Sequence, residues 1–433
     1  MQKGIALVYP YFQERDPVQK LFPPLGLAFL SAQLQAMQLP ATIYDCTFQT
    51  APAVLASIAR SQPALVGIYS MLTMSRPALE LAEKIRSLLP GSLLVAGGPL
   101  PTLYPQRFCN PFHLALRGES DLIFPAFCRE YLATGGHPDI LPRLSWERYP
   151  GAYYPSPQGL IQSAPIHQPS SILDRLPLPD RNQFDHARYQ QAWQESTGRK
   201  ATSMIITRGC PFSCDFCSKP VWGSQFRKSS LERVYAELAA IKALDYDQVW
   251  IADDSFTLDL KYLRAFCQGK IERQLDLGWT CLSRVDNLDQ PTVSLMKRAG
   301  CEKVYLGLES GSDRTLALMG KRATVRNGVE AVELFTSAGI KTAAFFIVGY
   351  PGESREDIER TFAYALSLRL DEISFNVPFP LPGSPLFSRL HGIDTDADWE
   401  VSKETTFVYP SEFDPSWIKK RIRHTLDRFD EQK

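Results

Sequence analysis

Short apolar runs alternate with amphipathic helical patterns along most of this chain, and that alternation restricts its fold more than any other feature. In residues 1–137 the apolar runs stand at 5–9, 41–44, 65–70, 93–96 and 114–117. Helical periodicity lies between them, as at 78–89. Strands that are joined by helices run parallel in one sheet, so this part is predicted to be a doubly wound, Rossmann-like α/β domain.

A second alternation begins near residue 201 and continues to 385. Its predicted strands are 203–207, 248–252, 279–283, 303–308, 342–348 and 372–377. Helical patterns follow them at 230–244, 261–273, 292–299, 325–338 and 355–368. Six successive strand–helix units predict a partial (β/α)6 barrel of the TIM type, with its reactive groups in the loops that follow the strands.

The two alternations are separated by residues 138–200, which are rich in Pro, Tyr and Trp. Because proline disfavours helices and central strands, this segment is predicted to be a surface connector. It is either a passive linker or a wall of the substrate site. Residues 386–433 are too few for another core, so they are predicted to form a small cap that ends in a helix at 417–429.

Charge and hydropathy exclude several classes of protein. Lys+Arg and Asp+Glu are equal at 47 each, which argues against a protein that binds nucleic acid or a membrane surface through net charge. No stretch approaches the ~18 apolar residues of a membrane span. The apolar run 5–9 ends at Pro10, too early for a signal segment. The chain is therefore predicted to be cytoplasmic, with its affinity in shaped sites.

Three of the nine cysteines, Cys210, Cys214 and Cys217, stand together in TRGCPFSCDFC, directly after the first predicted barrel strand. Three thiolates within eight residues favour one soft metal centre. Structural zinc takes four protein ligands, and no fourth Cys or His lies nearby with zinc spacing. Three cysteines on a four-iron cluster leave one iron open for a small molecule, so the iron–sulfur interpretation is preferred to zinc.

The other six cysteines are expected to be small buried hydrophobic residues, because an odd number spread over a long chain argues against a disulfide framework: Cys46, Cys109, Cys128, Cys267, Cys281 and Cys301.

With the Cys-x-x-x-Cys-x-x-Cys spacing and Phe216 before its last cysteine, the chain resembles the radical S-adenosylmethionine (SAM) enzymes. The resemblance implies that the three cysteines hold a 4Fe-4S cluster. It further implies that the open iron chelates the amino and carboxylate groups of SAM. Reductive cleavage would then give methionine and a 5′-deoxyadenosyl radical, with a flavodoxin or ferredoxin as the reductant.

The same resemblance assigns SAM contacts to later strand ends. It implies that Asp253 and Asp254 face the methionine amine, that Arg284 reaches the methionine carboxylate, and that Glu309 and Ser310 contact the ribose or the methionine moiety. A solvated turn is the alternative for the aspartates, and a surface ion pair is the alternative for Arg284. The adenine contacts that it implies are Ile347, Val348 and Pro382.

The N-terminal phrases KLFPPLGLAFLSAQLQ and VGIYSMLT resemble the cobalamin-binding domain of cobalamin-dependent radical SAM enzymes. This resemblance implies a cobalamin site at Tyr9, Ser70, Met71, Leu72, Gly97, Gly98, Pro99, Leu100, Gly118 and Glu119. None of the six histidines stands in the Asp-x-His-x-x-Gly pattern that supplies a cobalt ligand, so the cobalamin is expected to be base-off with no histidine on cobalt. A vestigial domain without cofactor is the alternative.

The leading function hypothesis is a cobalamin-dependent radical SAM methyltransferase. In that reaction the radical takes hydrogen from an unactivated carbon, and the substrate then receives methyl from methylcobalamin. The alternative is an enzyme with the same cofactors but no methyl transfer, which cyclises, rearranges or oxygenates a tetrapyrrole, lipid or natural-product precursor. A third hypothesis is a non-catalytic sensor or scaffold. Aromatic residues such as Phe345 and Phe346 suggest a small apolar or planar substrate.

Overall fold

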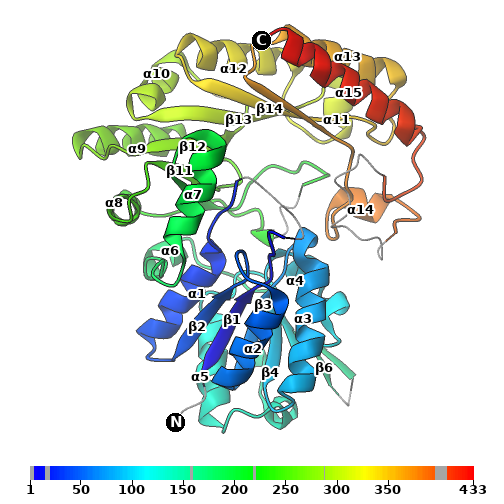
Figure 1. The fold of residues 1–433 in the computed structure, drawn as a ribbon. Coiled ribbons are helices and arrows are strands. Elements are labelled where there is room, and N and C mark those ends of the chain that lie inside the picture. The colour runs from blue at the N-terminus through cyan, green and yellow to red at the C-terminus, as the bar shows by residue number, and fades with distance from the viewer. Residues whose placement is uncertain (1–3, 15–19, 157–158, 218–220, 287, 395–406) are drawn as a thin grey trace. The chain divides into compact units, whose positions relative to one another are not determined.

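The computed structural model describes residues 4–14, 20–156, 159–217, 221–286, 288–394 and 407–433. The chain divides into two compact units, and the change from one to the other falls between Gly198 and Arg199. We call the described residues up to 198 the N-terminal unit and those from 199 onward the C-terminal unit (Figure 1). Each unit has its own sheet and its own apolar core.

The N-terminal unit is built on a seven-stranded sheet with the order β2-β1-β3-β4-β5-β6-β7. Its parallel strands are β1 (Ile5–Tyr9), β2 (Ala41–Asp45), β3 (Leu65–Tyr69), β4 (Leu93–Gly97) and β5 (Leu114–Leu116). β1 pairs with β2 on one side and with β3 on the other, so the strand order reverses here. In doubly wound sheets, ligands bind outside the carboxyl ends of the strands at such a switch point.

Helices form two layers on this sheet, in which α1 contacts α5 and α2 contacts α3. The helices are α1 (Leu25–Ala36), α2 (Ala51–Ser61), α3 (Ser75–Leu88), α4 (Pro99–Leu103) and α5 (Ile123–Ala133). Phe127, Tyr131 and Leu65 are fully buried in the core between strands and helices. The predicted doubly wound fold is confirmed.

The segment predicted as a connector folds as part of the N-terminal unit. It adds the antiparallel strands β6 (Ala152–Ser156) and β7 (Gly159–Gln162) at the edge of the sheet, and the helices α6 (Ile172–Arg175) and α7 (His186–Thr197). α7 forms because its sequence contains no proline, and the Asp185 side chain caps its first turn. Tyr189 and Trp193 of α7 are buried, and the Trp193 indole donates to the Leu21 carbonyl (2.6 Å).

The C-terminal unit contains a six-stranded parallel sheet whose spatial order follows the chain. Its strands are β8 (Ala201–Met204), β11 (Gln248–Ile251), β12 (Gly278–Ser283), β13 (Cys301–Glu309), β14 (Lys341–Ile347) and β15 (Glu372–Asn376). The connecting helices are α8 (Leu231–Ala243), α9 (Leu260–Glu272), α10 (Gln290–Arg298), α11 (Asp313–Leu318), α12 (Val325–Ser337) and α13 (Arg355–Ser367). This is the predicted partial (β/α)6 barrel.

Two further helices follow the last strand, α14 (Pro385–Arg389) and α15 (Pro415–Glu431). α15 is the predicted C-terminal helix, and it packs along α13 (Figure 1). Ile418 and Phe429 of α15 are buried in the same core as the barrel helices, so this helix completes the apolar layer outside β14 and β15.

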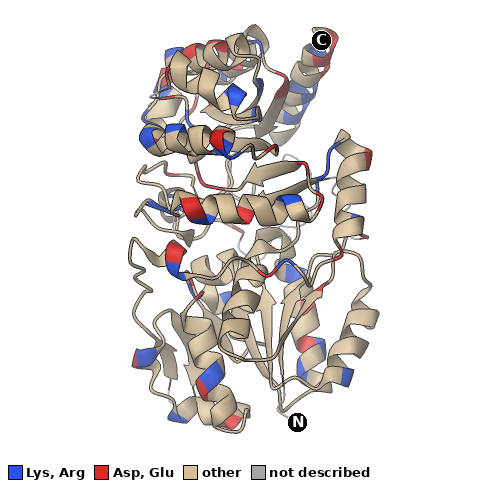
Figure 2. Cartoon of the chain, turned by 90° about the vertical axis from the view of Figure 1, so that its left-hand side faces the viewer, with Lys and Arg blue, Asp and Glu red and all other residues tan. Residues whose placement is uncertain are grey.

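Both basic and acidic residues are spread over the visible helices (Figure 2). This distribution agrees with the zero net charge of the chain. Among the described helices, none has the length and apolar character that crossing a lipid bilayer requires.

Candidate active site

The three-cysteine loop lies in the C-terminal unit beyond the carboxyl end of β8, as predicted. The short strands β9 (Thr207–Arg208) and β10 (Arg227–Lys228) pair antiparallel, and the loop lies between them. The Cys210 N–H donates to the Gly223 carbonyl (3.3 Å), which joins the two sides of the loop. The cysteines therefore stand at the end of the barrel where barrel enzymes carry their reactive groups.

The three thiols are half-buried, and in the described structure none of them forms a disulfide. Burial raises the pKa of the Cys210 thiol. Within the described residues, no three Cys, His, Asp or Glu side chains converge closely enough to hold a single metal ion. A four-iron cluster makes a different demand, because each thiolate binds a separate iron. Three half-exposed thiols in one short loop fit that donor set.

Asp215, between the second and third cysteines, ties the loop to the barrel. Its N–H donates to the Met319 carbonyl (3.0 Å), and its carbonyl accepts from the Leu386 N–H (3.0 Å). Its carboxylate pairs with Arg389 (2.8 Å) and accepts a hydrogen bond from the Tyr350 hydroxyl. Contacts with three later segments thus hold the cysteine loop. Asp215 is not among the site residues predicted from the sequence, and only its place inside the cysteine motif could have marked it.

Phe216, the aromatic residue of the motif, packs on a small apolar cluster of Met319, Tyr350 and Leu386. These three side chains are fully buried, whereas Phe216 is half-buried at the edge of the cluster. In this structure Phe216 therefore anchors the cysteine loop, and its contact with a cofactor stays a prediction.

The paired aspartates after β11 have different environments. Asp253 is 1% exposed, and its carboxylate accepts hydrogen bonds from the Ile206 N–H (2.8 Å), the Thr207 N–H (2.9 Å) and the Thr207 hydroxyl (2.7 Å). Burial raises the pKa of Asp253 to about 7. Asp254 is exposed and accepts a hydrogen bond from the backbone of Gly209. In this structure Asp253 therefore positions the segment before the cysteines, and its contact with the methionine amine stays a prediction.

Arg284 follows β12 and is 7% exposed. Its guanidinium donates to the Asp286 carboxylate (2.7 Å) and lies 3.5 Å from the centre of the Phe212 ring in the cysteine loop. The structure therefore shows Arg284 in an ion pair with Asp286, as the alternative interpretation expects, although the pair is largely buried and not at the surface. Its contact with Phe212 makes Arg284 a support for the loop.

Glu309 and Ser310 end β13 with opposite orientations. The Glu309 carboxylate pairs with Lys321 (2.7 Å), a residue that the sequence analysis did not select. Ser310 is fully buried and shares a hydrogen bond with the Thr361 hydroxyl of α13 (3.0 Å). The Ser310 hydroxyl thus faces the outer helix layer, and its contact with a cofactor stays a prediction.

The adenine contacts expected on β14 divide according to the alternation of a strand. Ile347 is half-buried on the same side as Phe345, whereas Val348 and Phe346 are fully buried in the core that the helices cover. The adenine contact therefore stays a prediction for both residues, and of the two only Ile347 is partly exposed. Pro382, beyond β15, is also buried.

In the N-terminal unit, the residues predicted for cobalamin lie at the carboxyl ends of β1, β3, β4 and β5. The Ser70 N–H donates to the Gly97 carbonyl (2.8 Å), and the Ser70 carbonyl accepts from the Leu100 N–H (3.2 Å). Gly98 has a φ of +108°, and a Cβ there would lie only 2.7 Å from the Ser70 oxygen. This close approach of two strand ends requires glycine.

Burial separates these predicted residues into two groups. The side chains of Ser70, Leu100 and Glu119 are buried. Their approach to a cobalamin stays a prediction. The remaining predicted positions are half-buried at this edge of the sheet: Tyr9, Met71, Leu72, Gly97, Gly98, Pro99 and Gly118. These residues form the surface that a flat ligand could contact.

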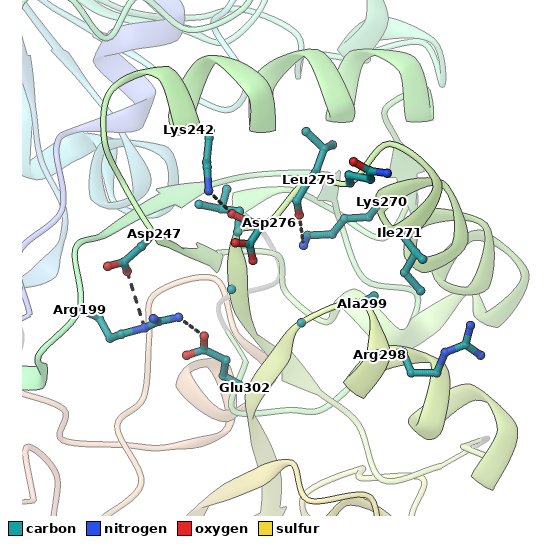
Figure 3. Close-up of a pocket in the computed structure, with 14 residues that line it drawn as sticks. Arg199, Lys242, Asp247, Lys270, Ile271, Leu275, Asp276, Arg298, Ala299 and Glu302 are labelled. Carbon is teal, nitrogen blue, oxygen red and sulfur yellow. Dashed lines mark hydrogen bonds and ion pairs between the residues drawn. The ribbon is translucent and has the colours of Figure 1, made fainter.

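A cavity of about 420 Å³ lies at the opposite, amino end of the barrel strands (Figure 3). Its walls include Arg199, Gly278 and Glu302, which stand where β8, β12 and β13 begin. Arg199 is held between the Asp247 and Glu302 carboxylates. Conserved function in such barrels concentrates at the carboxyl end, so this cavity is not the candidate active site.

Lys270 in this cavity gives a prediction for stability. It is 4% exposed, its ammonium donates to the Leu275 carbonyl (2.6 Å), and burial lowers its pKa from 10.5 to about 8. The folded state therefore binds this proton less tightly than the unfolded state, which lowers the free energy of unfolding. This loss of stability is complete below about pH 8 and fades as the pH rises toward 10.5. We expect Lys270→Met to stabilise the protein by about 2 kcal/mol at pH 7, after loss of the hydrogen bond.

Denaturant unfolding at pH 7 and pH 10 checks this prediction. The advantage of Lys270→Met should shrink at pH 10, and Lys261→Met, at an exposed position of the same helix, should change little at either pH. A Lys270→Met protein that is less stable than the parent at pH 7 would show that the ammonium is favourable in its site.

The fold and the site together are those of an α/β protein of two units, with a three-cysteine loop at the carboxyl end of a partial barrel. The profile of the Radical SAM superfamily matches residues 204–365, and that of the B12 binding domain matches residues 16–127. The chain therefore contains a radical SAM domain and a B12-binding domain. These two domains imply a 4Fe-4S cluster, SAM and cobalamin as its cofactors.

Individual proteins agree with this assignment. An uncharacterised methyltransferase of Pyrococcus horikoshii is 29% identical over 84% of this chain and 78% of its own length. The anaerobic magnesium-protoporphyrin IX monomethyl ester cyclase of Rubrivivax gelatinosus is 28% identical over 64% of this chain, which spans half of that longer protein. The structure of the radical SAM methyltransferase TsrM from Kitasatospora setae shares the fold, with a TM-score of 0.74, 18% identity and coverage of 89% of this chain and 74% of TsrM.

Proposed function

We propose that this enzyme transfers a methyl group to an unactivated carbon of a small-molecule substrate. The observation that carries the proposal is the union, in one chain, of a three-cysteine barrel loop and a B12-binding domain. When bound, the cluster and SAM supply a 5′-deoxyadenosyl radical that takes hydrogen from an inert C–H bond, and cobalamin carries the methyl group. The similarity to a methyltransferase over most of the chain supports this choice.

The residues of the barrel would bind and orient these groups. Cys210, Cys214 and Cys217 would hold the cluster as thiolates, after losing their protons. Asp254 and Glu309 offer carboxylates to the amine and hydroxyl groups of SAM, because both stand at the carboxyl ends of barrel strands. A flavodoxin- or ferredoxin-type protein would supply the electron.

In the N-terminal unit, the proposed cobalamin is base-off and has no histidine on cobalt. Two of the histidines are engaged with the backbone of their own unit. His113 accepts from the Leu94 N–H (3.0 Å), and the His186 ring lies 2.7 Å from the Arg181 carbonyl oxygen. The half-buried Met71 and Leu72 beyond β3 are the apolar neighbours that support an open lower face.

An aromatic row on the barrel strands supports an apolar or planar substrate. Tyr305 of β13 stacks on Phe345 of β14, with 5.9 Å between ring centres, and meets Trp250 of β11 edge-on at 4.9 Å. All three side chains are half-buried, whereas their strand neighbours such as Phe346 are fully buried. Half-exposed aromatic faces on the inner side of the barrel suit a flat or apolar ligand.

The second candidate is a reaction with the same cofactors but no methyl transfer. The similarity to the cyclase of Rubrivivax gelatinosus favours it, because that protein is named for ring closure rather than methylation. The fold accommodates both outcomes, since they differ in what happens to the substrate after hydrogen is removed.

Methyl-labelled SAM distinguishes the two. The reconstituted enzyme, with cobalamin, a low-potential reductant and an extract of small molecules, is expected to form 5′-deoxyadenosine and a labelled product. The proposal fails if 5′-deoxyadenosine forms together with an altered but unlabelled product. Enzyme that produces no 5′-deoxyadenosine under these conditions would contradict radical SAM chemistry itself.

A further inference from the structure

The backbone at Glu309 is held in an unusual conformation. Its φ is +64°, in the left-handed region that residues other than glycine seldom adopt, and the pairing register between β13 and β14 shifts between Gly307 and Glu309. Strain of this kind persists only where the surroundings impose it, and it concentrates at functional sites. The surroundings of Glu309 therefore indicate what its conformation serves.

One oxygen of the Glu309 carboxylate is fixed and the other is not. Oε1 pairs with the Lys321 ammonium at 2.7 Å, and the two side chains are only 9% and 7% exposed. Among the described residues, none donates a hydrogen bond to Oε2. A buried carboxylate with one oxygen in an ion pair and the other without a donor can accept a hydrogen bond from a ligand.

Glycine at position 307 makes room for this arrangement. A Cβ at Gly307 would lie 2.5 Å from Glu309 Oε1 and 2.8 Å from Lys321 Nζ. Since neither contact is tolerable, any side chain at 307 would displace the ion pair. The pair thus lies directly over the β13 backbone.

Lys321 comes from the turn that also supports the cysteine loop. Met319 accepts the hydrogen bond from the Asp215 N–H (3.0 Å), and a Cβ at Gly320 would lie 3.0 Å from the Ser213 oxygen. Met319 and Gly320 therefore lie against the cysteine loop, and the next residue, Lys321, pairs with Glu309. One turn links the cluster-binding loop to the carboxylate of β13.

We propose that Lys321 is a positioning residue for SAM binding, which fixes the rotamer of Glu309 and aligns its free oxygen with the cysteine loop. This inference rests on the proposed function, because it takes SAM as the ligand that Glu309 meets. Lys321 itself contacts Glu309 and acts through it.

Equilibrium binding of SAM to the anaerobically reconstituted full-length enzyme tests the proposal. We expect Lys321→Met to weaken SAM binding by 10-fold or more while iron per chain stays at the parental value. Lys321→Arg, which keeps the charge, should recover most of the affinity. Glu309→Gln should weaken binding to a similar extent, and the double variant should be no weaker than the single ones, because both changes remove one interaction.

Lys200→Met is the matched control, because Lys200 pairs with Asp245 (2.5 Å) before β8, at the amino edge of the same sheet. It should bind SAM like the parent. Parental affinity in Lys321→Met, or strictly additive losses in the double variant, would overturn the proposal. If the parent enzyme itself binds no SAM, the proposed function fails, which is a separate outcome. The double variant removes both charges and so keeps the test valid if Lys321→Met alone folds poorly.

Discussion

Replacing Cys210 by alanine is expected to abolish iron–sulfur assembly and SAM cleavage while leaving the fold in place. In the proposed site the cluster takes its protein ligands from three thiols, and no other cysteine is adjacent in the sequence to replace one of them. SAM cleavage should fall by more than about 1,000-fold, because the cluster is the source of the electron. Iron and sulfide analysis, with 5′-deoxyadenosine as the activity readout, measures both effects.

The fold should survive this substitution because the contact that holds Cys210 runs through its backbone. Its N–H bonds to the Gly223 carbonyl, and alanine keeps that bond. We expect the apo forms of the parent and Cys210→Ala to unfold within about 1 kcal/mol of each other. Cys109→Ala, at a half-buried cysteine of the N-terminal unit, should keep full iron content and activity. If the Cys210→Ala protein unfolds and the parent does not cleave SAM, the result would favour the third hypothesis, a non-catalytic sensor or scaffold.

The strands and helices of the two alternating regions, 1–137 and 201–385, could largely be predicted from the sequence because they depend on local periodicity. β11, predicted at 248–252, spans Gln248–Ile251, and α13, predicted at 355–368, spans Arg355–Ser367. The cysteine motif was equally visible, because its ligands lie within eight residues of one another. The site residues that could not be predicted depend instead on contacts between different segments of the chain.

Lys321 and Asp215 illustrate this limit. Lys321 lies twelve residues beyond Glu309, and the Tyr350 hydroxyl that reaches Asp215 comes from 135 residues later. No spacing rule relates such positions, because α11 and its turn lie between Glu309 and Lys321, and the strands β11 to β14 lie between Asp215 and Tyr350. Helix α7 in the predicted connector was missed for a related reason. The prolines of the connector indicated a loop, whereas the proline-free stretch of α7 packs on a distant part of the N-terminal unit, where Trp193 donates to the Leu21 carbonyl.

Asp253 and Asp254 carry the same side chain in adjacent positions, and the structure predicts opposite responses to the same substitution. Asp253→Asn is expected to lower the free energy of unfolding by about 2–4 kcal/mol. Both Asp253 oxygens accept hydrogen bonds from residues 206 and 207. Whichever way the amide of an asparagine turns, its NH2 group faces a donor, so one buried N–H loses its acceptor.

This substitution should also reduce cluster retention, because residues 206 and 207 lead directly into the cysteine loop. Anaerobic denaturant unfolding measures the first effect, and iron retained after gel filtration measures the second. Asp254→Asn is the matched control, since its side chain is exposed and its loss should cost less than about 1 kcal/mol. Equal destabilisation by both substitutions would contradict the role assigned to Asp253. A stable Asp253→Asn protein that retains iron but binds SAM weakly would instead support a direct contact between Asp253 and SAM.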